Sequence, residues 1–326
     1  MLLQENLDYY IGKGAMIVTK VLAWASVAGL LAAASDCGSG GPANCLWRAW
    51  GCGCEGGARA LQSASGDPGR LYAARAMPAL ILPPRYTPDS IAIWSAALQA
   101  GWDVERLAGW HTPEHLRDAD PVLYGEPLFA AAAVADSLGL SLLEPDPGWL
   151  PALPLAYRGR SVSLSTLGAA RALATAAFIK SASDKSFPAR VYAAGTDLPR
   201  EEILPHDQPV LIAEPVRWTV EFRFFVLDGT IATGSVYIRG GGLAEAEDGS
   251  WPAESEDTEA AHNFAPRVVA DQAAAVPAAV VLDVGQIAGY GWAVVEANSA
   301  WGSGLCGCDP TKVLAALRRA CSPQGP

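Results

Sequence analysis

The sequence predicts a mixed protein of the α/β (α+β) class, in which sheets and helices both contribute to the cores. From Met77 onward, short apolar runs typical of buried strands alternate with segments of helical period. In the second half, longer strands alternate between apolar and polar residues and are joined by tight turns. Hydrophobic residues make up 51% of the 326 residues, which is enough for sizeable cores and excludes wholesale disorder.

Composition divides the chain into three predicted parts. Residues 1–76 carry six bases and five acids and have no helix or strand period, so we expect an unstructured or signal-like extension. Residues 77–156 predict a small α/β domain that ends in a proline-rich linker near 145–156, and residues 157–326 form the third part. The net charge of −11 offers no electrostatic footprint for nucleic acid or an anionic membrane surface.

In the middle part, strand and helix patterns follow one another. Residues 79–82 predict a buried strand, and Thr87 is the expected N-cap of a helix that ends at Gly101. Three apolar residues recur within that helix at helical spacing, namely Ile91, Trp94 and Leu98. Residues 102–107 predict a second strand and residues 127–138 a second helix, which together suggest a small doubly wound sheet.

Three polar residues of the middle part are candidates for function. Arg85 lies just past the first strand, where α/β sheets bind ligands, but a surface salt bridge explains it equally well. His111 and His115 share a helical spacing without a third ligand nearby. For these histidines we expect solvated surface rather than a metal site.

The third part opens with two lysines on either side of a small polar loop. Ser165 is the predicted cap of a helix over 167–177, and the strand after it ends at Lys180. Lys185 lies five residues later in the loop, so one charge is fixed on a strand and the other is carried by a mobile segment, which suits phosphate binding. Solvated lysines beside a turn are the alternative. No Walker loop is present.

A hairpin of two long strands follows. Residues 210–213 predict a buried strand ended by Glu214, and residues 218–227 alternate apolar and polar side chains up to an Asp-Gly turn. Glu221 and Arg223 then stand side by side on the polar face, for which the alternative is an exposed cross-strand ion pair. Residues 245–259 hold seven acids and no base, which predicts a mobile solvated loop, with a lid as the alternative.

Two further strands end in oxygen-bearing side chains. A buried strand over 280–282 ends at Asp283, and a Gly-Tyr-Gly turn leads to a strand that ends in Glu296-Ala297-Asn298. Period two places Glu296 and Asn298 on one face, and the turn allows Asp283 to lie opposite Glu296. Two carboxylates and an amide oxygen suit Mg²⁺. A polar sheet edge is the alternative, but carboxylates are seldom buried unpaired.

Taken in order, these residues resemble the ATP-grasp superfamily and, within it, the clade named for one arginine and two lysines. The middle part, with ILPPRYT and LEPDPGWLPALP, resembles that clade's pre-ATP-grasp domain. The resemblance covers about residues 77–320. It implies an ATP-grasp fold of two α+β subdomains preceded by a small α/β pre-ATP-grasp domain.

The resemblance also implies roles for single residues. Lys180 and Lys185 would contact the ATP phosphates, Glu214 would help hold the adenosine, and the backbone near Val216 would meet the adenine edge. Arg223 would face the γ-phosphate and the acyl phosphate, and with Lys185 it is the catalytic candidate.

The remaining implied roles lie near the C-terminus. Three side chains would hold Mg²⁺, namely Asp283, Glu296 and Asn298. Many ATP-grasp enzymes have a proline soon after the asparagine, whereas residues 299–302 read Ser-Ala-Trp-Gly, so the loop for the acceptor substrate is not assigned. For Cys306 and Cys308 just beyond it we expect adventitious surface thiols.

The function implied by the resemblance is an ATP- and Mg²⁺-dependent carboxylate–amine ligase that forms an amide or peptide bond through an acyl phosphate. Its partners would be small-molecule or peptide carboxylates and amines, without nucleic acid or membrane. A nucleotide-binding module without ligase activity stays open as an alternative.

Location depends on the first part of the chain. An uncharged run at 21–34, VLAWASVAGLLAAA, follows two lysines and ends in small residues, which is the layout of a secretory signal peptide. This run leaves an exported or membrane-associated protein as the alternative. We favour an upstream extension of a cytoplasmic enzyme whose natural start is Met77, because the downstream residues resemble a nucleotide-using enzyme.

Overall fold

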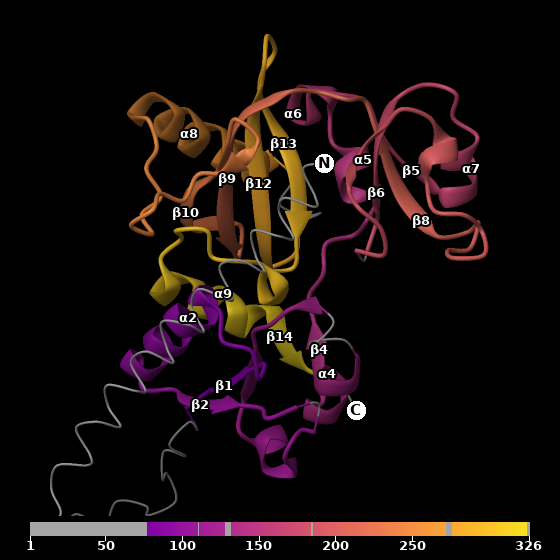
Figure 1. The fold of residues 1–326 in the computed structure, drawn as a ribbon. Helices are drawn as coiled ribbons and strands as arrows, with labels where there is room; N and C mark the ends of the chain where they lie inside the picture. Colours follow the sequence, from indigo (N-terminus) through magenta and orange to yellow (C-terminus); the bar gives the residue numbers. More distant parts are fainter. Residues whose placement is uncertain (1–76, 110, 128–131, 184, 272–275, 325–326) are drawn as a thin grey trace, which may run out of the picture. The chain divides into compact units, whose positions relative to one another are not determined.

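The computed structural model describes residues 77–109, 111–127, 132–183, 185–271 and 276–324. These residues belong to one compact unit within Ala73–Pro326, which contains the sheets shown in Figure 1. The predictions for residues 1–76, including the apolar run at 21–34, lie outside the described residues. Among the helices that the structure describes, none is long and apolar enough to cross a membrane.

The middle part contains a three-stranded parallel sheet of order β2-β1-β3. Its strands are β1 (Ala79–Leu82), β2 (Asp103–Arg106) and β3 (Pro121–Leu123). The first two confirm the predicted strands, whereas β3 was not predicted, because three residues are too few to show a period. The helices beside this sheet are α2 (Pro88–Gln99), the 3-10 helix η1 (Glu114–Asp118) and α4 (Ala132–Leu138).

Helix α2 begins where its capping residues predict. The Ser90 amide donates to Thr87 Oγ1 at 3.1 Å, and the Thr87 amide donates to Ser90 Oγ at 2.9 Å, which forms a capping box. Gly101 follows the helix with a φ of +76°, as a C′ glycine does. The apolar residues at helical spacing predicted the helix but not its buried face: Ile91, Trp94 and Leu98 are exposed, whereas Ile93, Ala96 and Ala97 are buried.

The predicted linker near 145–156 is ordered by two short helices, α5 (Trp149–Ala152) and α6 (Leu155–Arg158). Just before it, β4 (Leu140–Leu142) pairs antiparallel with β14 (Cys321–Pro323), so the C-terminal end of the chain returns to the middle part. This pairing was not predicted.

The third part opens with a four-stranded antiparallel sheet of order β5-β8-β6-β7. Its strands are β5 (Val162–Thr166), β6 (Ala177–Ser181), β7 (Arg190–Tyr192) and β8 (Pro209–Ala213), accompanied by α7 (Leu167–Arg171) and the 3-10 helix η2 (Gly195–Asp197). The helix predicted over 167–177 is therefore shorter. Its cap is Thr166 rather than Ser165, since the Ala169 amide donates to Thr166 Oγ1 at 3.2 Å.

The larger sheet has five strands in the order β11-β10-β9-β12-β13 (Figure 1). They are β9 (Trp218–Leu227), β10 (Thr230–Arg239), β11 (Gly242–Leu243), β12 (Ala279–Ile287) and β13 (Gly291–Asn298). The predicted hairpin turn is confirmed by positive φ angles at Asp228 and Gly229. The prediction that Asp283 ends its strand is wrong, because Asp283 lies in the middle of β12.

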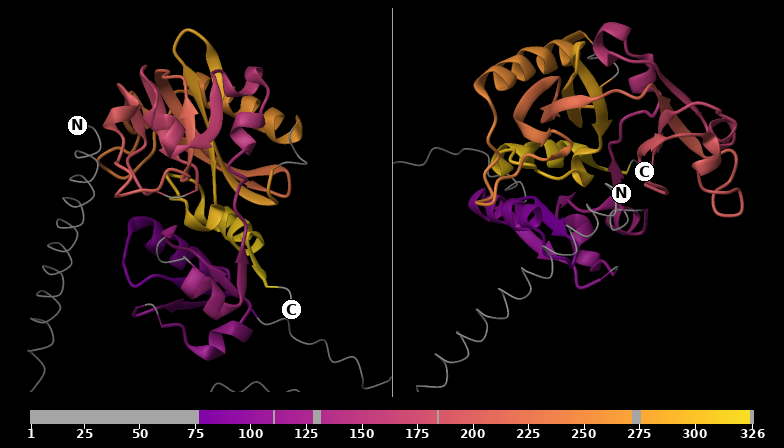
Figure 2. Two further views of the ribbon diagram at one scale, coloured as in Figure 1. Left: turned by 90° about the vertical axis from the view of Figure 1, so that its right-hand side faces the viewer. Right: turned by 45° about the horizontal axis from the view of Figure 1, so that its top comes forward.

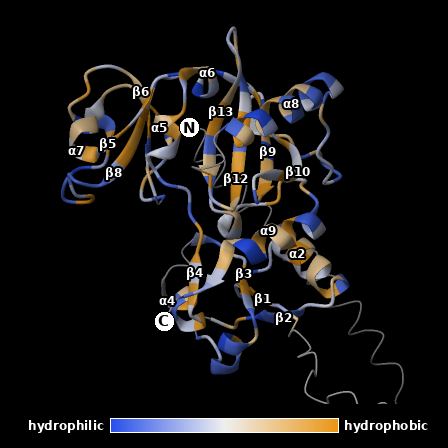
Figure 3. Ribbon diagram, turned by 180° about the vertical axis from the view of Figure 1, so that it is seen from behind, coloured by the Kyte–Doolittle hydropathy of each residue, from blue (hydrophilic) through white to orange (hydrophobic). Residues whose placement is uncertain are grey.

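A helix covers part of the acidic run that predicted a mobile loop. Residues 255–271 form α8 (Ser255–Asp271), whose early acids complement the helix dipole, and Arg239 Nη1 contacts Asp257 Oδ2 at 3.1 Å. The prediction of a loop up to residue 259 is wrong from Ser255 onward. Figures 2 and 3 show α8 lying across one face of the large sheet, and its Ala261, Ala265, Val268 and Val269 are buried in the core there.

The two faces of the large sheet have different partners. Towards α8, the sheet presents a fully apolar layer that includes Phe222, Phe224, Leu282 and Val294. On the opposite face, Phe225 and Val281 join a second core with α9 (Pro310–Ala320) and the parallel sheet. The rest of that face carries polar side chains, and the 3-10 helix η3 (Ala300–Gly302) follows β13 beside it.

Candidate active site

Five of the predicted site residues meet on the polar face of the large sheet. They are called the polar cluster below and comprise Lys180, Arg223, Asp283, Glu296 and Asn298. Strand register explains the meeting, because Asp283 is the partner of Arg223 on one side and of Glu296 on the other. The predicted opposition of Asp283 and Glu296 is confirmed, and Lys180 reaches the cluster from the smaller sheet.

Arg223 and Asp283 form a bidentate, buried ion pair. Arg223 Nε donates to Asp283 Oδ1 at 3.0 Å and Nη2 donates to Oδ2 at 2.8 Å, with side-chain exposures of 8% and 1%. Burial disfavours a charged guanidinium, but the Asp283 carboxylate raises the pKa of Arg223 well above its usual range. The Tyr237 ring lies 4.3 Å from the guanidinium carbon and adds a cation–π contact.

Glu296 is held by a lysine and an amide. Lys180 Nζ lies 2.5 Å from Glu296 Oε2, and Asn298 Nδ2 donates to Glu296 Oε1 at 2.9 Å and to Asp283 Oδ2 at 3.2 Å. Burial by itself would raise the pKa of Glu296, but Lys180 and Asn298 lower it to about 2. Asn298 thereby links the two carboxylates, and Glu296 and Asn298 share one face as predicted.

Two residues beside the polar cluster were missed or misjudged from the sequence. Arg160 is buried and donates to the carbonyls of Val294 and Val295 at 2.8 and 2.9 Å, and its burial lowers its pKa to about 10. Glu221 is also buried, so the interpretation of Glu221 and Arg223 as an exposed ion pair is wrong. Period two placed Glu221 on this face, but no local pattern marks Arg160.

Glu221 makes stability depend on pH. Burial, with Asp283 and Glu296 nearby, raises its pKa from 4.5 to about 8. Between these values the folded state keeps a proton that the unfolded chain has released, so stability falls as the pH rises, by at most about 1.4 kcal/mol per pH unit. We expect Glu221→Gln to flatten this decline and to be more stable than the wild type near pH 8. Urea unfolding of both proteins from pH 5 to 9 measures how the free energy of unfolding depends on pH. Parallel pH curves for the wild type and the variant would contradict the prediction.

In the part of the chain that the structure describes, no hydrogen bond or ion pair joins the other predicted nucleotide residues to the polar cluster. Lys185 is exposed in the loop between β6 and β7. Glu214 and Val216 lie in the connection from β8 to β9, which leads from the smaller sheet to the larger. Glu214 is exposed and its Oε2 accepts from the Ser161 amide at 3.3 Å, while Val216 is half-buried.

The prediction of surface thiols at Cys306 and Cys308 is wrong. Cys308 is buried, and Cys306 is half-buried with its Sγ 3.6 Å from Arg223 Nη1. Burial raises the pKa of both thiols to about 12, so they are protonated at neutral pH. The cause is the loop after η3, which folds back against β9 and was not assigned from the sequence.

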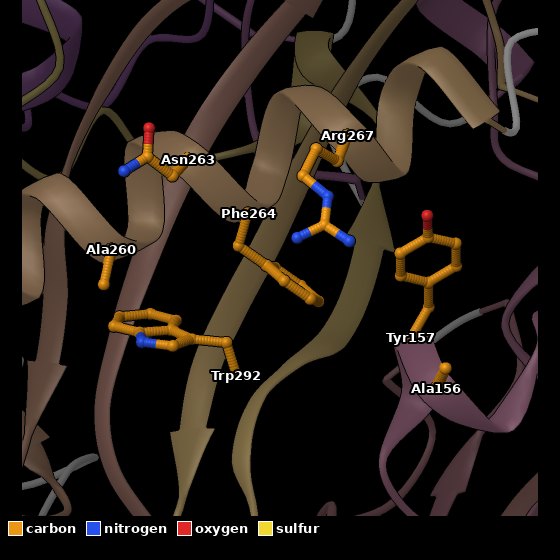
Figure 4. Close-up of a pocket in the computed structure, with 7 residues that line it drawn as sticks. All are labelled: Ala156, Tyr157, Ala260, Asn263, Phe264, Arg267 and Trp292. Atoms are coloured by element: carbon orange, nitrogen blue, oxygen red, sulfur yellow. The ribbon is translucent and has the colours of Figure 1, made fainter.

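The candidates of the middle part lie on the surface. Arg85 Nη1 pairs with Glu126 Oε1 at 3.0 Å and both side chains are 60% exposed, which favours the salt-bridge interpretation. His111 and His115 are exposed. Away from the polar cluster, α6, α8 and β13 enclose a hollow of about 420 Å³ lined by Tyr157, Phe264 and Trp292 among others (Figure 4).

Several solved structures are similar to this chain, whereas no curated protein matches its sequence. Similar solved structures include a RimK domain ATP-grasp protein from Sphaerobacter thermophilus, D-cycloserine synthetase DcsG and D-alanine–D-alanine ligase from Bacillus anthracis. Their sequence identities are 15%, 15% and 12%, and their TM-scores are 0.46, 0.45 and 0.44. The matches cover 74%, 74% and 75% of this chain, and 98%, 98% and 96% of the respective structures.

A family model of the ATP-grasp domain matches residues 157–316, and it describes family 2 of the clade named for one arginine and two lysines. These residues contain the smaller sheet, the larger sheet and every member of the polar cluster. The chain therefore carries an ATP-grasp domain of this clade over residues 157–316.

Proposed function

We propose that this protein is an ATP- and Mg²⁺-dependent carboxylate–amine ligase that acts through an acyl phosphate. The observation that carries the proposal is the polar cluster, in which two cations and three oxygen-bearing side chains alternate within hydrogen-bonding distance. Phosphoryl transfer needs positive charge and positioning more than a protein nucleophile, and this cluster supplies both. A cytoplasmic location belongs to the proposal, because ATP is the co-substrate.

The cations of the polar cluster would bind phosphate. Lys180 is only partly exposed and pairs with Glu296, so binding of ATP would exchange this carboxylate for phosphate oxygens. Arg223 keeps its bidentate bond to Asp283 through Nε and Nη2, which leaves Nη1 directed at the Gly304 carbonyl and Cys306. We place the γ-phosphate at this side of the guanidinium. The β8–β9 connection, with Glu214 and Val216, would hold the adenosine.

The oxygen donors fit a magnesium ion by their chemistry. Asp283 and Glu296 supply carboxylates, and Asn298 already touches both of them, so a rotated amide would present its oxygen to the same point. Within the described ranges, no group of three or more His, Cys, Asp or Glu side chains is arranged to hold a metal, so the amide oxygen is needed as the third donor. When bound there, Mg²⁺ would neutralise phosphate charge.

The proposed reaction has two steps. A carboxylate oxygen of the first substrate attacks the γ-phosphorus, its O–P bond forms, the bond from the γ-phosphorus to the bridging oxygen breaks, and ADP leaves. The amine nitrogen of the second substrate then attacks the acyl carbon, the C–N bond forms, the C–O bond to phosphate breaks, and the nitrogen proton passes to the leaving phosphate. Arg223 and Lys180 stabilise the charge on the transferred group.

The test of the proposal is ADP release with ATP and Mg²⁺ against a panel of amino acids and peptides, offered singly and in pairs. We expect ADP release that requires both a carboxylate and an amine, and a product mass equal to the two substrates less one water. ATP binding without release for any pair would favour the alternative of a nucleotide-binding module.

The two lysines are expected to differ in role. Lys180→Ala removes a charge fixed on β6 and should weaken ATP affinity about tenfold or more. Lys185 lies in an exposed loop, so Lys185→Ala should lower turnover more than affinity, because a loop that closes late can favour the transition state. ATP titration and single-turnover kinetics separate the effects, with Lys312→Ala, at an exposed position of α9, as the control. Equal losses of affinity with unchanged turnover of bound ATP would refute this division.

A further inference from the structure

The carboxyl ends of the parallel strands bring polar side chains close to the polar cluster. In the strand order β2-β1-β3, the chain passes from β1 to β2 on one side of β1 and then crosses to β3 on the other side. In open α/β sheets, ligands bind outside the carboxyl ends at such a change of direction. Asp89, in the first turn of α2 after β1, and Tyr124, directly after β3, lie at this place.

This place adjoins the polar cluster through the loop after η3. The Leu305 amide donates to Asp89 Oδ2 at 3.0 Å, and Arg223 Nη1 donates to the Gly304 carbonyl at 3.2 Å. A Cβ at Gly304 would lie 3.0 Å from Asp89 Oδ2 and 3.8 Å from Arg223 Nη1. Asp89 and the guanidinium therefore lie on two sides of one glycine, close enough for one small molecule to touch both.

Two polar side chains at this place, Asp89 and Tyr124, have hydrogen-bonding capacity that the described residues do not satisfy. Within the part of the chain that the structure describes, Asp89 forms no ion pair, and one of its oxygens accepts the Leu305 amide. Tyr124 is only 6% exposed, and its hydroxyl has no hydrogen-bond partner among the described residues. Burial raises the pKa of the Tyr124 hydroxyl, Asp89 and Cys306 raise it further, and Arg223 lowers it.

We infer that Asp89 anchors the amine substrate, as an ammonium ion, in a subsite formed by Asp89, Tyr124 and the loop at 304–306. The inference rests on the proposed ligase function and names the residue that selects its second substrate. A carboxylate substrate would be repelled by Asp89 and attracted by Arg223, so the two substrates would bind at opposite ends of the subsite. Glu245 also acts electrostatically on Asp89 and favours a cation there.

Asp89 would also deprotonate the bound ammonium before the amine reacts. One ammonium proton passes to Asp89, which leaves a neutral amine and a carboxylic acid. The freed nitrogen lone pair then forms the C–N bond, the C–O bond to phosphate breaks, and the second nitrogen proton passes to the leaving phosphate. Burial raises the pKa of Asp89, which favours this transfer over one to an exposed aspartate.

Binding of two small probes tests the inference without knowledge of the natural substrates. Glycinamide carries an ammonium group, and glycolamide has a neutral hydroxyl in its place. We follow the Leu305 amide by NMR, because this amide donates to Asp89. The wild type should bind glycinamide about tenfold or more tightly than glycolamide. Asp89→Asn, which keeps a hydrogen-bond acceptor but loses the charge, should bind both probes equally.

Two further variants serve as controls. Asp103→Asn removes an exposed acid at the start of β2 and should keep the preference for glycinamide, as should Asp89→Glu, which retains the charge. A wild type without preference, or a preference that persists in Asp89→Asn, would overturn the inference. ATP binding is measured separately on the same proteins, so failure to bind ATP would count against the proposed function alone.

Discussion

Replacing Arg223 with Met is expected to lower the free energy of unfolding by about 3–5 kcal/mol and to abolish ATP turnover. The Asp283 carboxylate is 1% exposed and receives two hydrogen bonds from this guanidinium, so the variant leaves a buried acid without its cation. The carboxyl must then take up a proton or draw in water, and either costs free energy. Urea unfolding at neutral pH measures the loss.

Two comparisons show whether the buried pair is the cause. Arg319→Met removes an exposed arginine that pairs with Asp228 at 3.1 Å, and it should change the stability by at most about 1 kcal/mol. Adding Asp283→Asn to Arg223→Met should restore part of the stability, because a neutral amide costs less to bury than an unpaired charge. Equal losses of unfolding free energy for Arg223→Met and Arg319→Met would show that leaving Asp283 buried without its partner does not cause the loss.

Replacing Glu296 with Gln is expected to reduce Mg²⁺-dependent ATP turnover by at least about 10²-fold while leaving the fold intact. The substitution removes one carboxylate of the proposed metal site and keeps the shape of the side chain. Its structural cost should be small, because the lost partner is Lys180 and both side chains are partly exposed, at 21% and 29%. Turnover is measured over a range of Mg²⁺ concentrations, and the fold by thermal unfolding.

A matched variant separates a metal effect from a general change in charge. Glu259→Gln removes an exposed acid on α8, on the other face of the large sheet, and should leave turnover unchanged. The Glu296 variant should also need more Mg²⁺ to reach half of its residual turnover. If its turnover and its Mg²⁺ dependence match those of the wild type, Glu296 does not hold the metal.

The sequence alone determined the parts of this protein that depend on neighbours along the chain. Period two fixed which residues of 218–227 share a face, and Asp-Gly with its positive φ angles fixed the hairpin turn. The turn at 289–291 sets the register as far as the pair Val284 and Val294, and a register shift beyond it brings Asp283 opposite Glu296. Local pattern therefore placed Glu296 and Asn298 on one face, whereas the exact partner of Asp283 depends on a bulge that the sequence did not predict.

Only the tertiary structure decided which faces are buried and which distant segments meet. Alternation placed Glu221 and Arg223 on one face, but their burial depends on elements that local period does not specify. The contact between Asp89 and Leu305 joins residues 216 apart, and the buried position of Cys308 depends on how that loop folds back. Burial and long-range contact result from the packing of whole elements, whereas the sequence pattern records only the local backbone period.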